Sequence, residues 1–123
     1  MPCCTRMPVV LIVEDEPLVR VGACNMIEDA GFEVIEAASA DEAIRILESR
    51  SDIRVVFTDV HMPGTMDGLR LAHAVRGRWP PIKIIVTSGR EVLTQHDLPE
   101  SGRFFAKPYN PIQLRDTLRA WAL

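Results

Sequence analysis

The sequence contains no apolar run that approaches the roughly 20 residues needed to cross a membrane as a helix. Its opening stretch, MPCCTRMP, lacks the long apolar core of a secretory signal peptide. The net charge of −3 is too small to indicate nucleic acid or an anionic membrane as a partner. We therefore expect a cytoplasmic protein with no nucleic-acid partner and no membrane partner.

Cysteine is scarce, and its spacing is wrong for a disulfide framework. The three cysteines are Cys3, Cys4 and Cys24, an odd number that is typical of free thiols in a reducing compartment. The adjacent pair matches no zinc-binding pattern, so a metal or lipid site at Cys3 and Cys4 is the less favoured reading. With 123 residues, 47% of them hydrophobic and 25% charged, the chain fits one compact soluble domain.

Short apolar runs separated by turn residues divide the chain into alternating strands and helices. The run VVLIV at residues 9–13 is uninterrupted, which is typical of a strand buried on both faces of a parallel sheet. The predicted strands are Val9–Val13, Glu33–Ala37, Arg54–Thr58, Lys83–Thr87 and Arg103–Ala106. Their alternation with helices predicts a parallel sheet that is covered on both faces.

Residues at helical spacing predict helices over 17–30, after residue 39, over 68–75 and from Pro111 onward. The first helix is expected to end at Gly31. The stripe expected to face inward on this helix is Val19, Gly22, Ala23, Met26, Ile27 and Ala30. Ser39 or Asp41 is expected to cap the second helix. The predicted inward residues are Ala43, Ile44 and Leu47 in the second helix, and Leu114, Leu118 and Trp121 in the last.

Polar side chains follow four of the predicted strands at the points where the strands end. They are Glu14 and Asp15 after the first strand, Asp59 after the third, Thr87 and Ser88 at the end of the fourth, and Lys107 after the fifth. Because ligands bind beyond the carboxyl ends of the strands in an open parallel sheet, we expect these side chains to converge on one rim.

Three converging carboxylates repel one another unless a cation lies between them. Mg²⁺ prefers oxygen ligands, and the lack of histidine or cysteine at ligand spacing argues against zinc. With such an ion in place, a carboxylate can act as a nucleophile toward a phosphoryl group. Lys107 is one of only two lysines among 14 basic residues, the other being Lys83, and a compact ammonium suits a single phosphoryl oxygen.

Four blocks of the sequence resemble the signature blocks of bacterial two-component response-regulator receiver domains. They are LIVEDEP, TDVHMPGTMDG, IIVTSG and FFAKPYNP, each close to the end of a predicted strand. The resemblance covers about Val9 to Leu123. It implies an α/β fold of the flavodoxin-like type, with a doubly wound five-stranded parallel sheet in the order 2-1-3-4-5. We expect one stand-alone receiver domain over residues 1–123, with 1–7 as an extension and no output domain.

The resemblance also implies a role for each rim residue. Asp59 would be the phosphoacceptor, and Lys107 would pair with the acyl phosphate. Mg²⁺ would be held by Asp15 directly, by Glu14 largely through water, by Asp59, and by the backbone carbonyl of His61. Thr87, which the resemblance favours over Ser88, would be the switch hydroxyl and Phe104 the aromatic switch residue. The Lys107–Pro108 bond would be cis.

The implied function is a signalling switch that acts on no other substrate. A histidine kinase or a histidine phosphotransfer protein would phosphorylate Asp59, and water would later remove the phosphoryl group. Leu18 and Val21 fall outside the inward stripe of the first helix, and they are candidates for an exposed docking surface for that donor. The signal would leave by protein contact, from a monomer or a weak dimer.

The sequence departs from the family pattern in two places. The loop HMPGTMDG is one residue longer than usual, with Thr65 as the extra residue. The stretch GREVLTQHDLPESG, residues 89–102, has few apolar residues and is interrupted by Pro99, so we expect a short or mobile fourth helix there.

Three alternative functions stay open at this point. A pseudo-receiver that binds partners without phosphorylation is disfavoured by the complete set of Glu14, Asp15, Asp59 and Lys107. An Asp-nucleophile phosphatase of the haloacid dehalogenase type would carry a second aspartate where His61 stands. A flavin or nucleotide module would need a phosphate loop after the first strand, where EDEP instead repels phosphate.

Overall fold

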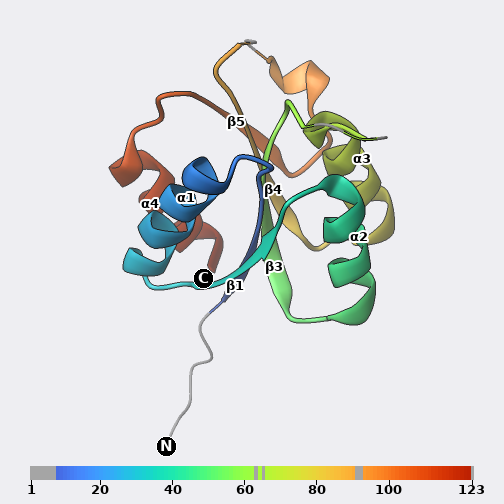
Figure 1. Ribbon diagram of the computed structural model, residues 1–123, viewed down its shortest axis with the longest axis horizontal. Helices are drawn as coiled ribbons and strands as arrows, with labels where there is room; N and C mark the ends of the chain where they lie inside the picture. Colours follow the sequence, from blue (N-terminus) through green and yellow to red (C-terminus); the bar gives the residue numbers. More distant parts are fainter. Residues whose placement is uncertain (1–7, 63, 65, 91–92, 123) are drawn as a thin grey trace, which may run out of the picture.

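The computed structural model describes residues 8–62, 64, 66–90 and 93–122, and it contains one five-stranded sheet (Figure 1). The strands are β1 (Val9–Val13), β2 (Glu33–Ala37), β3 (Ile53–Asp59), β4 (Lys83–Ser88) and β5 (Gly102–Ala106). All four pairings are parallel, and the strand order is β2-β1-β3-β4-β5. The predicted flavodoxin-like topology is therefore confirmed, with the strand bounds shifted by at most one residue.

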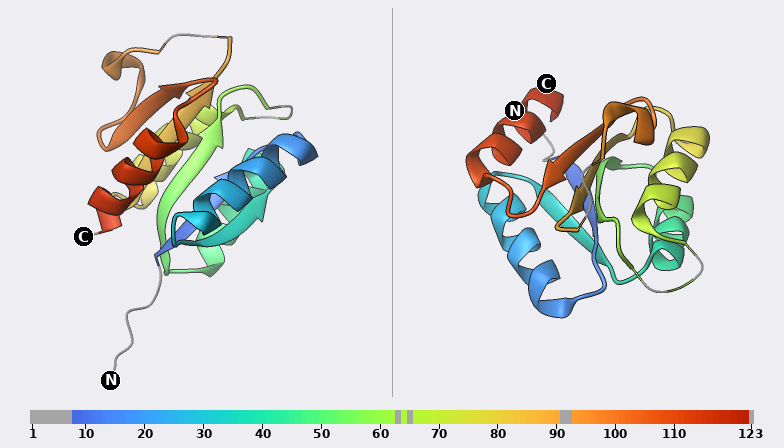
Figure 2. Two further views of the ribbon diagram at one scale, coloured as in Figure 1. Left: turned by 90° about the vertical axis from the view of Figure 1, so that its left-hand side faces the viewer. Right: turned by 90° about the horizontal axis from the view of Figure 1, so that it is seen from above.

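The helices lie in two layers, one on each face of the sheet. They are α1 (Pro17–Asp29), α2 (Ala40–Ser49), α3 (Gly68–Arg78) and α4 (Pro111–Ala122), together with a short 3₁₀ helix, η1 (Gln95–Asp97). Figures 1 and 2 show α1 and α4 on one face and α2 and α3 on the other. Among the described residues, no helix is long and apolar enough to cross a membrane.

Each layer closes over its own apolar cluster. Leu11, Val56 and Ile84 point toward α2 and α3, whereas Ile12 and Ile85 point toward α1 and α4. Neighbouring side chains of a strand point to opposite faces, so the uninterrupted apolar runs supply both clusters at once.

Side-chain caps fix the starts of two helices. The hydroxyl oxygen of Ser39 accepts a hydrogen bond from the backbone N–H of Glu42 at 3.1 Å, so Ser39 and not Asp41 caps α2. Asp67 caps α3 in the same way, through the backbone N–H of Arg70 at 2.8 Å. At the end of α1, Gly31 has φ +103°, a backbone conformation that favours glycine, as predicted.

One prediction needs correction. The stripe predicted for α1 placed Val19 and Gly22 inward, but both are exposed, while Ala23, Cys24 and Ile27 are buried. The short helix expected in residues 89–102 is, in the described part of that segment, the three-residue 3₁₀ helix η1. Its polar sequence offers no apolar stripe, and Pro99 cannot continue a helix. Val92 and Thr65 lie outside the described residues, as do Cys3 and Cys4.

Candidate functional site

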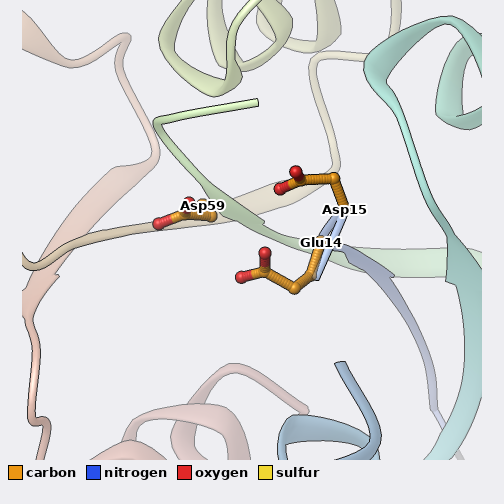
Figure 3. A group of neighbouring side chains, drawn as sticks. All are labelled: Glu14, Asp15 and Asp59. Carbon is orange, nitrogen blue, oxygen red and sulfur yellow. The ribbon is translucent and has the colours of Figure 1, made fainter. Parts of the chain in front are cut away.

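Three carboxylates from two adjacent strands meet at the carboxyl edge of the sheet. Glu14 and Asp15 follow β1, and Asp59 is the last residue of β3. One oxygen from each carboxylate lies within 4.8 Å of the others. Figure 3 shows Glu14 and Asp15 extending from the end of β1 to the side on which Asp59 lies. Glu14 and Asp59 are buried and Asp15 is half-buried, so water can screen their mutual repulsion only in part.

Lys107 brings a single ammonium group to this cluster. Its Nζ lies 3.0 Å from Oδ1 of Asp59 and 3.5 Å from Oε1 of Glu14. Burial by itself lowers the pKa of Lys107, but the hydrogen bond and charge of Asp59, together with Glu14, outweigh burial and raise it. Lys107 is therefore a permanent cation beside the carboxylates.

The pKa of Glu14 is raised even though Lys107 lies beside it. Burial raises the pKa of the Glu14 carboxyl, and the charge of Asp59 raises it further. Lys107 and the backbone N–H of Glu16, which donates to Oε2 at 3.1 Å, act in the opposite direction without reversing the shift. Three carboxylates facing one ammonium leave room for a further positive charge. Oxygen donors alone suit a hard divalent cation such as Mg²⁺.

A buried hydroxyl lies beside the phosphoacceptor candidate. Thr87 of β4 is paired in register with Asp59 of β3, and its Oγ1 donates to the backbone carbonyl of Thr58 at 3.4 Å. Ser88 is equally buried, but its Oγ accepts a hydrogen bond from the backbone N–H of Arg90 at 3.1 Å. The Thr87 hydroxyl is thus turned toward β3.

The structure places the other predicted residues around this rim. Phe104 is half-buried against the cluster under α2 and α3, while Phe105 is buried under α1 and α4. The Lys107–Pro108 bond is cis, as predicted. His61 is exposed next to the site. Its role as a carbonyl ligand stays a prediction.

Sequence reasoning missed two residues that shape the site. Arg20 of α1 donates from Nη1 to the backbone carbonyl of Glu14 at 2.7 Å. Gly68, the first residue of α3, lies so close to β3 that a Cβ atom there would meet the backbone carbonyl of Asp59. No signal in the sequence marked Gly68, since a Cβ atom at Gly77 of the same helix would meet nothing within 4 Å.

Comparisons with known proteins agree with this geometry. A sequence model of the response regulator receiver domain matches residues 10–119. The sensor kinase CckA of Brucella abortus is 39% identical over 114 residues, which are 89% of this chain and 12% of the kinase. The aerobic respiration control protein ArcA of Escherichia coli K12 is 35% identical, over 94% of this chain and 48% of ArcA. The chain thus spans less than half the length of either relative.

Solved structures lead to the same family. The receiver domain of the hybrid histidine kinase CckA superposes with a TM-score of 0.76 at 31% identity, covering 94% of this chain and 99% of that domain. The response regulator TrrA of Thermotoga maritima, in complex with Mg²⁺ and BeF, gives a TM-score of 0.80 at 25% identity, covering 94% and 99%. With the acidic rim, the sheet order and the sequence match in agreement, the chain belongs to the response regulator receiver domain family of two-component signalling.

Proposed function

We propose that Asp59 is phosphorylated in a Mg²⁺-dependent reaction by a histidine kinase or a histidine phosphotransfer protein, and that the phosphoryl group controls the contacts of this domain with other proteins. The observation that carries the proposal is the position of the Asp59 carboxylate. It lies 3.0 Å from the Lys107 ammonium, and one of its oxygens lies within 4.8 Å of carboxylate oxygens of Glu14 and Asp15. The Mg²⁺–BeF complex of the similar TrrA supports the same chemistry.

The transfer step needs one nucleophile and a means of stabilising charge. A carboxylate oxygen of Asp59 attacks the phosphorus of phosphohistidine, the new P–O bond forms, and the P–N bond breaks with its electron pair returning to the imidazole. Lys107 stays protonated and faces the phosphoryl oxygens. Mg²⁺, held by Glu14, Asp15, Asp59 and the backbone carbonyl of His61, would neutralise part of the phosphoryl charge. Water later attacks phosphorus and releases inorganic phosphate and the free carboxylate.

Phosphorylation changes the charge that Thr87 and Lys107 face. The phosphoryl group adds about −1.5 to −2 charge at a rim that already holds three carboxylates. Thr87 can exchange its bond to the carbonyl of Thr58 for one to a phosphoryl oxygen, and Phe104 occupies the adjoining strand as the aromatic switch residue. Such a change biases a two-state equilibrium of the face around β4 and β5.

Two exposed apolar side chains on α1 support a binding surface for the phosphoryl donor. Leu18 and Val21 of α1 are exposed apolar side chains that follow the acidic rim in sequence, which supports α1 as the docking surface for the phosphoryl donor. We propose that the domain works in the cytoplasm as a monomer or weak dimer, and that its output is a protein contact and not a reaction on another substrate.

The test is the intact mass after incubation with acetyl phosphate, with and without Mg²⁺. We expect one phosphoryl adduct that requires Mg²⁺ and is absent from Asp59→Asn. Asp116→Asn is the matched control, because Asp116 is an exposed aspartate of α4 that pairs with Arg115. If no adduct forms even with a phosphorylated histidine kinase as the donor and with rapid quenching, the proposal fails, and a receiver that acts without phosphorylation takes its place.

A further inference from the structure

The first turn of α1 is oriented against the usual preference of its residues. Leu18, Val19 and Val21 are 82%, 42% and 52% exposed, yet the side chain of Arg20 between them is only 20% exposed. A cation this close to a helix N-terminus also opposes the helix dipole. A helix start that turns its arginine inward and Leu18, Val19 and Val21 outward needs a strong interaction on the inner side.

Arg20 makes two such interactions with two different strands. Its Nη1 donates to the backbone carbonyl of Glu14 at 2.7 Å, just beyond β1. Its Nε donates to Oε1 of Glu36 in β2 at 3.0 Å. The guanidinium group can do both at once because its N–H donors project in fixed, different directions.

The carbonyl that Arg20 binds lies where the backbone leaves the sheet. The N–H of Glu14 still bonds to the carbonyl of Ala37 in β2, at 3.0 Å, and the chain then bends at Asp15 and Glu16. Successive residues of a straight strand point to opposite faces. The bend therefore accounts for the adjacent carboxylates of Glu14 and Asp15 both lying on the side of Asp59 (Figure 3).

We propose that Arg20 is a positioning residue for the metal site: it binds the Glu14 carbonyl, is anchored on Glu36, and thereby keeps Glu14 and Asp15 directed at one cation. The inference rests on the proposed Mg²⁺ site. Arg20 binds the backbone next to the ligands and contacts neither the ion nor the phosphoryl group. Loss of such supporting contacts typically weakens metal binding by about 10- to 100-fold.

The sign of the effect separates positioning from simple electrostatics. Arg20 is a cation near the carboxylates, so by charge alone its removal would strengthen the binding of Mg²⁺. If Arg20 instead holds the bend, Arg20→Gln weakens binding. Arg20→Lys keeps the charge, but one ammonium cannot replace two diverging N–H donors, so this variant also binds Mg²⁺ more weakly than the wild type.

The experiment is titration calorimetry of the unphosphorylated full chain with Mg²⁺ alone. We expect the dissociation constant to rise about tenfold in Arg20→Gln and several-fold in Arg20→Lys. Arg78→Gln is the matched control. Arg78 of α3 pairs with Glu48 of α2 at 2.8 Å and lies far along the chain from the acidic residues of the site. The dissociation constant of Mg²⁺ should not change in this variant. Should Arg20→Gln not fold, Arg20→Lys carries the test, because it keeps the charge and only positioning then predicts weaker binding.

The possible results separate this inference from the proposed function. If the wild type binds no Mg²⁺, the metal site itself is wrong. If the wild type binds Mg²⁺ and Arg20→Gln or Arg20→Lys binds it equally well or more tightly, the site stands and the positioning role of Arg20 is wrong.

Discussion

The ammonium of Lys107 and the carboxylate of Asp59 are in direct contact, with Nζ 3.0 Å from Oδ1, across the gap between β3 and β5. The strand β4 lies between β3 and β5, so this contact joins two strands that are not adjacent in the sheet. A second carboxylate, Glu14, lies 3.5 Å from the same nitrogen. The proposed phosphorylation of Asp59 would change this contact first, because it attaches a larger and more highly charged phosphoryl group to a carboxylate oxygen of Asp59.

Lys107→Met keeps much of the apolar stem and removes the charge. We expect phosphoryl transfer from acetyl phosphate to slow about tenfold or more, because a preorganised cation that faces the transferring group is lost. The measurement is the initial rate of adduct formation. Lys83→Met is the matched control, since Lys83 is the only other lysine and begins β4 at the opposite edge. Equal loss in both variants would contradict a specific role of Lys107.

Gly68→Ala tests how closely α3 approaches Asp59 at the end of β3. A Cβ atom at Gly68 would collide with the backbone carbonyl of Asp59, whereas one at Gly77 in the same helix meets nothing within 4 Å. We expect Gly68→Ala to lower the free energy of unfolding by about 1–3 kcal/mol and to slow phosphorylation.

Gly77→Ala serves as the control for this pair, because it should leave phosphorylation unchanged and stabilise the helix by up to about 1 kcal/mol. Urea unfolding followed by circular dichroism measures both variants. Similar stabilities for the two variants would show that α3 can shift away from Asp59 without cost.

Gly89→Ala addresses the lifetime of the phosphoryl group. A Cβ atom at position 89 would lie 3.6 Å from Cβ of Lys107, an ordinary contact that needs no rearrangement. The added methyl group would cover one flank of the site and hinder the attacking water. We expect the phosphorylated protein to lose its adduct several-fold more slowly, measured as adduct decay after the donor is removed. Unchanged or faster decay would mean that water approaches from another side.

The pKa of Glu14 predicts a pH-dependent stability in the absence of metal. Burial raises that pKa above the ordinary value of 4.5, so the unfolded chain releases this proton first as the pH rises. The wild type therefore loses stability as the pH rises through the raised pKa. Glu14→Gln cannot ionise, so it should gain melting temperature over the wild type at about pH 8 and gain less at about pH 5.

Thermal melts in EDTA at both pH values measure this difference. Glu48→Gln on α2 is the control, because Glu48 is an exposed carboxylate that pairs with Arg78. An equal gain for Glu14→Gln at both pH values would contradict a raised pKa at Glu14.

The sheet and the rim could be predicted from the sequence because both depend on local signals. Apolar runs such as Val9–Val13 are typical of strands in a covered parallel sheet, and the residues that follow such strands share its carboxyl edge. The orientation of α1 could not be predicted in the same way. Apolar residues at helical spacing predicted that Val19 faces inward. The structure instead buries most of the Arg20 side chain, which donates hydrogen bonds to the backbone carbonyl of Glu14 and to the carboxylate of Glu36 in β2.

The segment 89–102 shows a second limit of sequence reasoning. Besides the local capping box between Thr94 and Asp97, the 3₁₀ helix η1 and the residues after it are held by contacts between residues far apart in sequence. Nε2 of His73 lies 3.1 Å from the backbone carbonyl of Asp97, and Arg76 pairs with Glu100 at 3.2 Å. Leu98 is buried in the cluster under α2 and α3. None of these contacts leaves a periodic pattern in the sequence.

The most direct test of the account is the identity of the residue that carries the phosphoryl group. The wild-type chain is treated with acetyl phosphate and Mg²⁺ and then with sodium borohydride, which reduces an aspartyl phosphate to homoserine, and the peptides are sequenced by mass spectrometry. The account predicts homoserine at position 59 only, and only when Mg²⁺ is present. Homoserine at Asp15 or another aspartate, or at no position while a phosphoryl adduct is present, would contradict it.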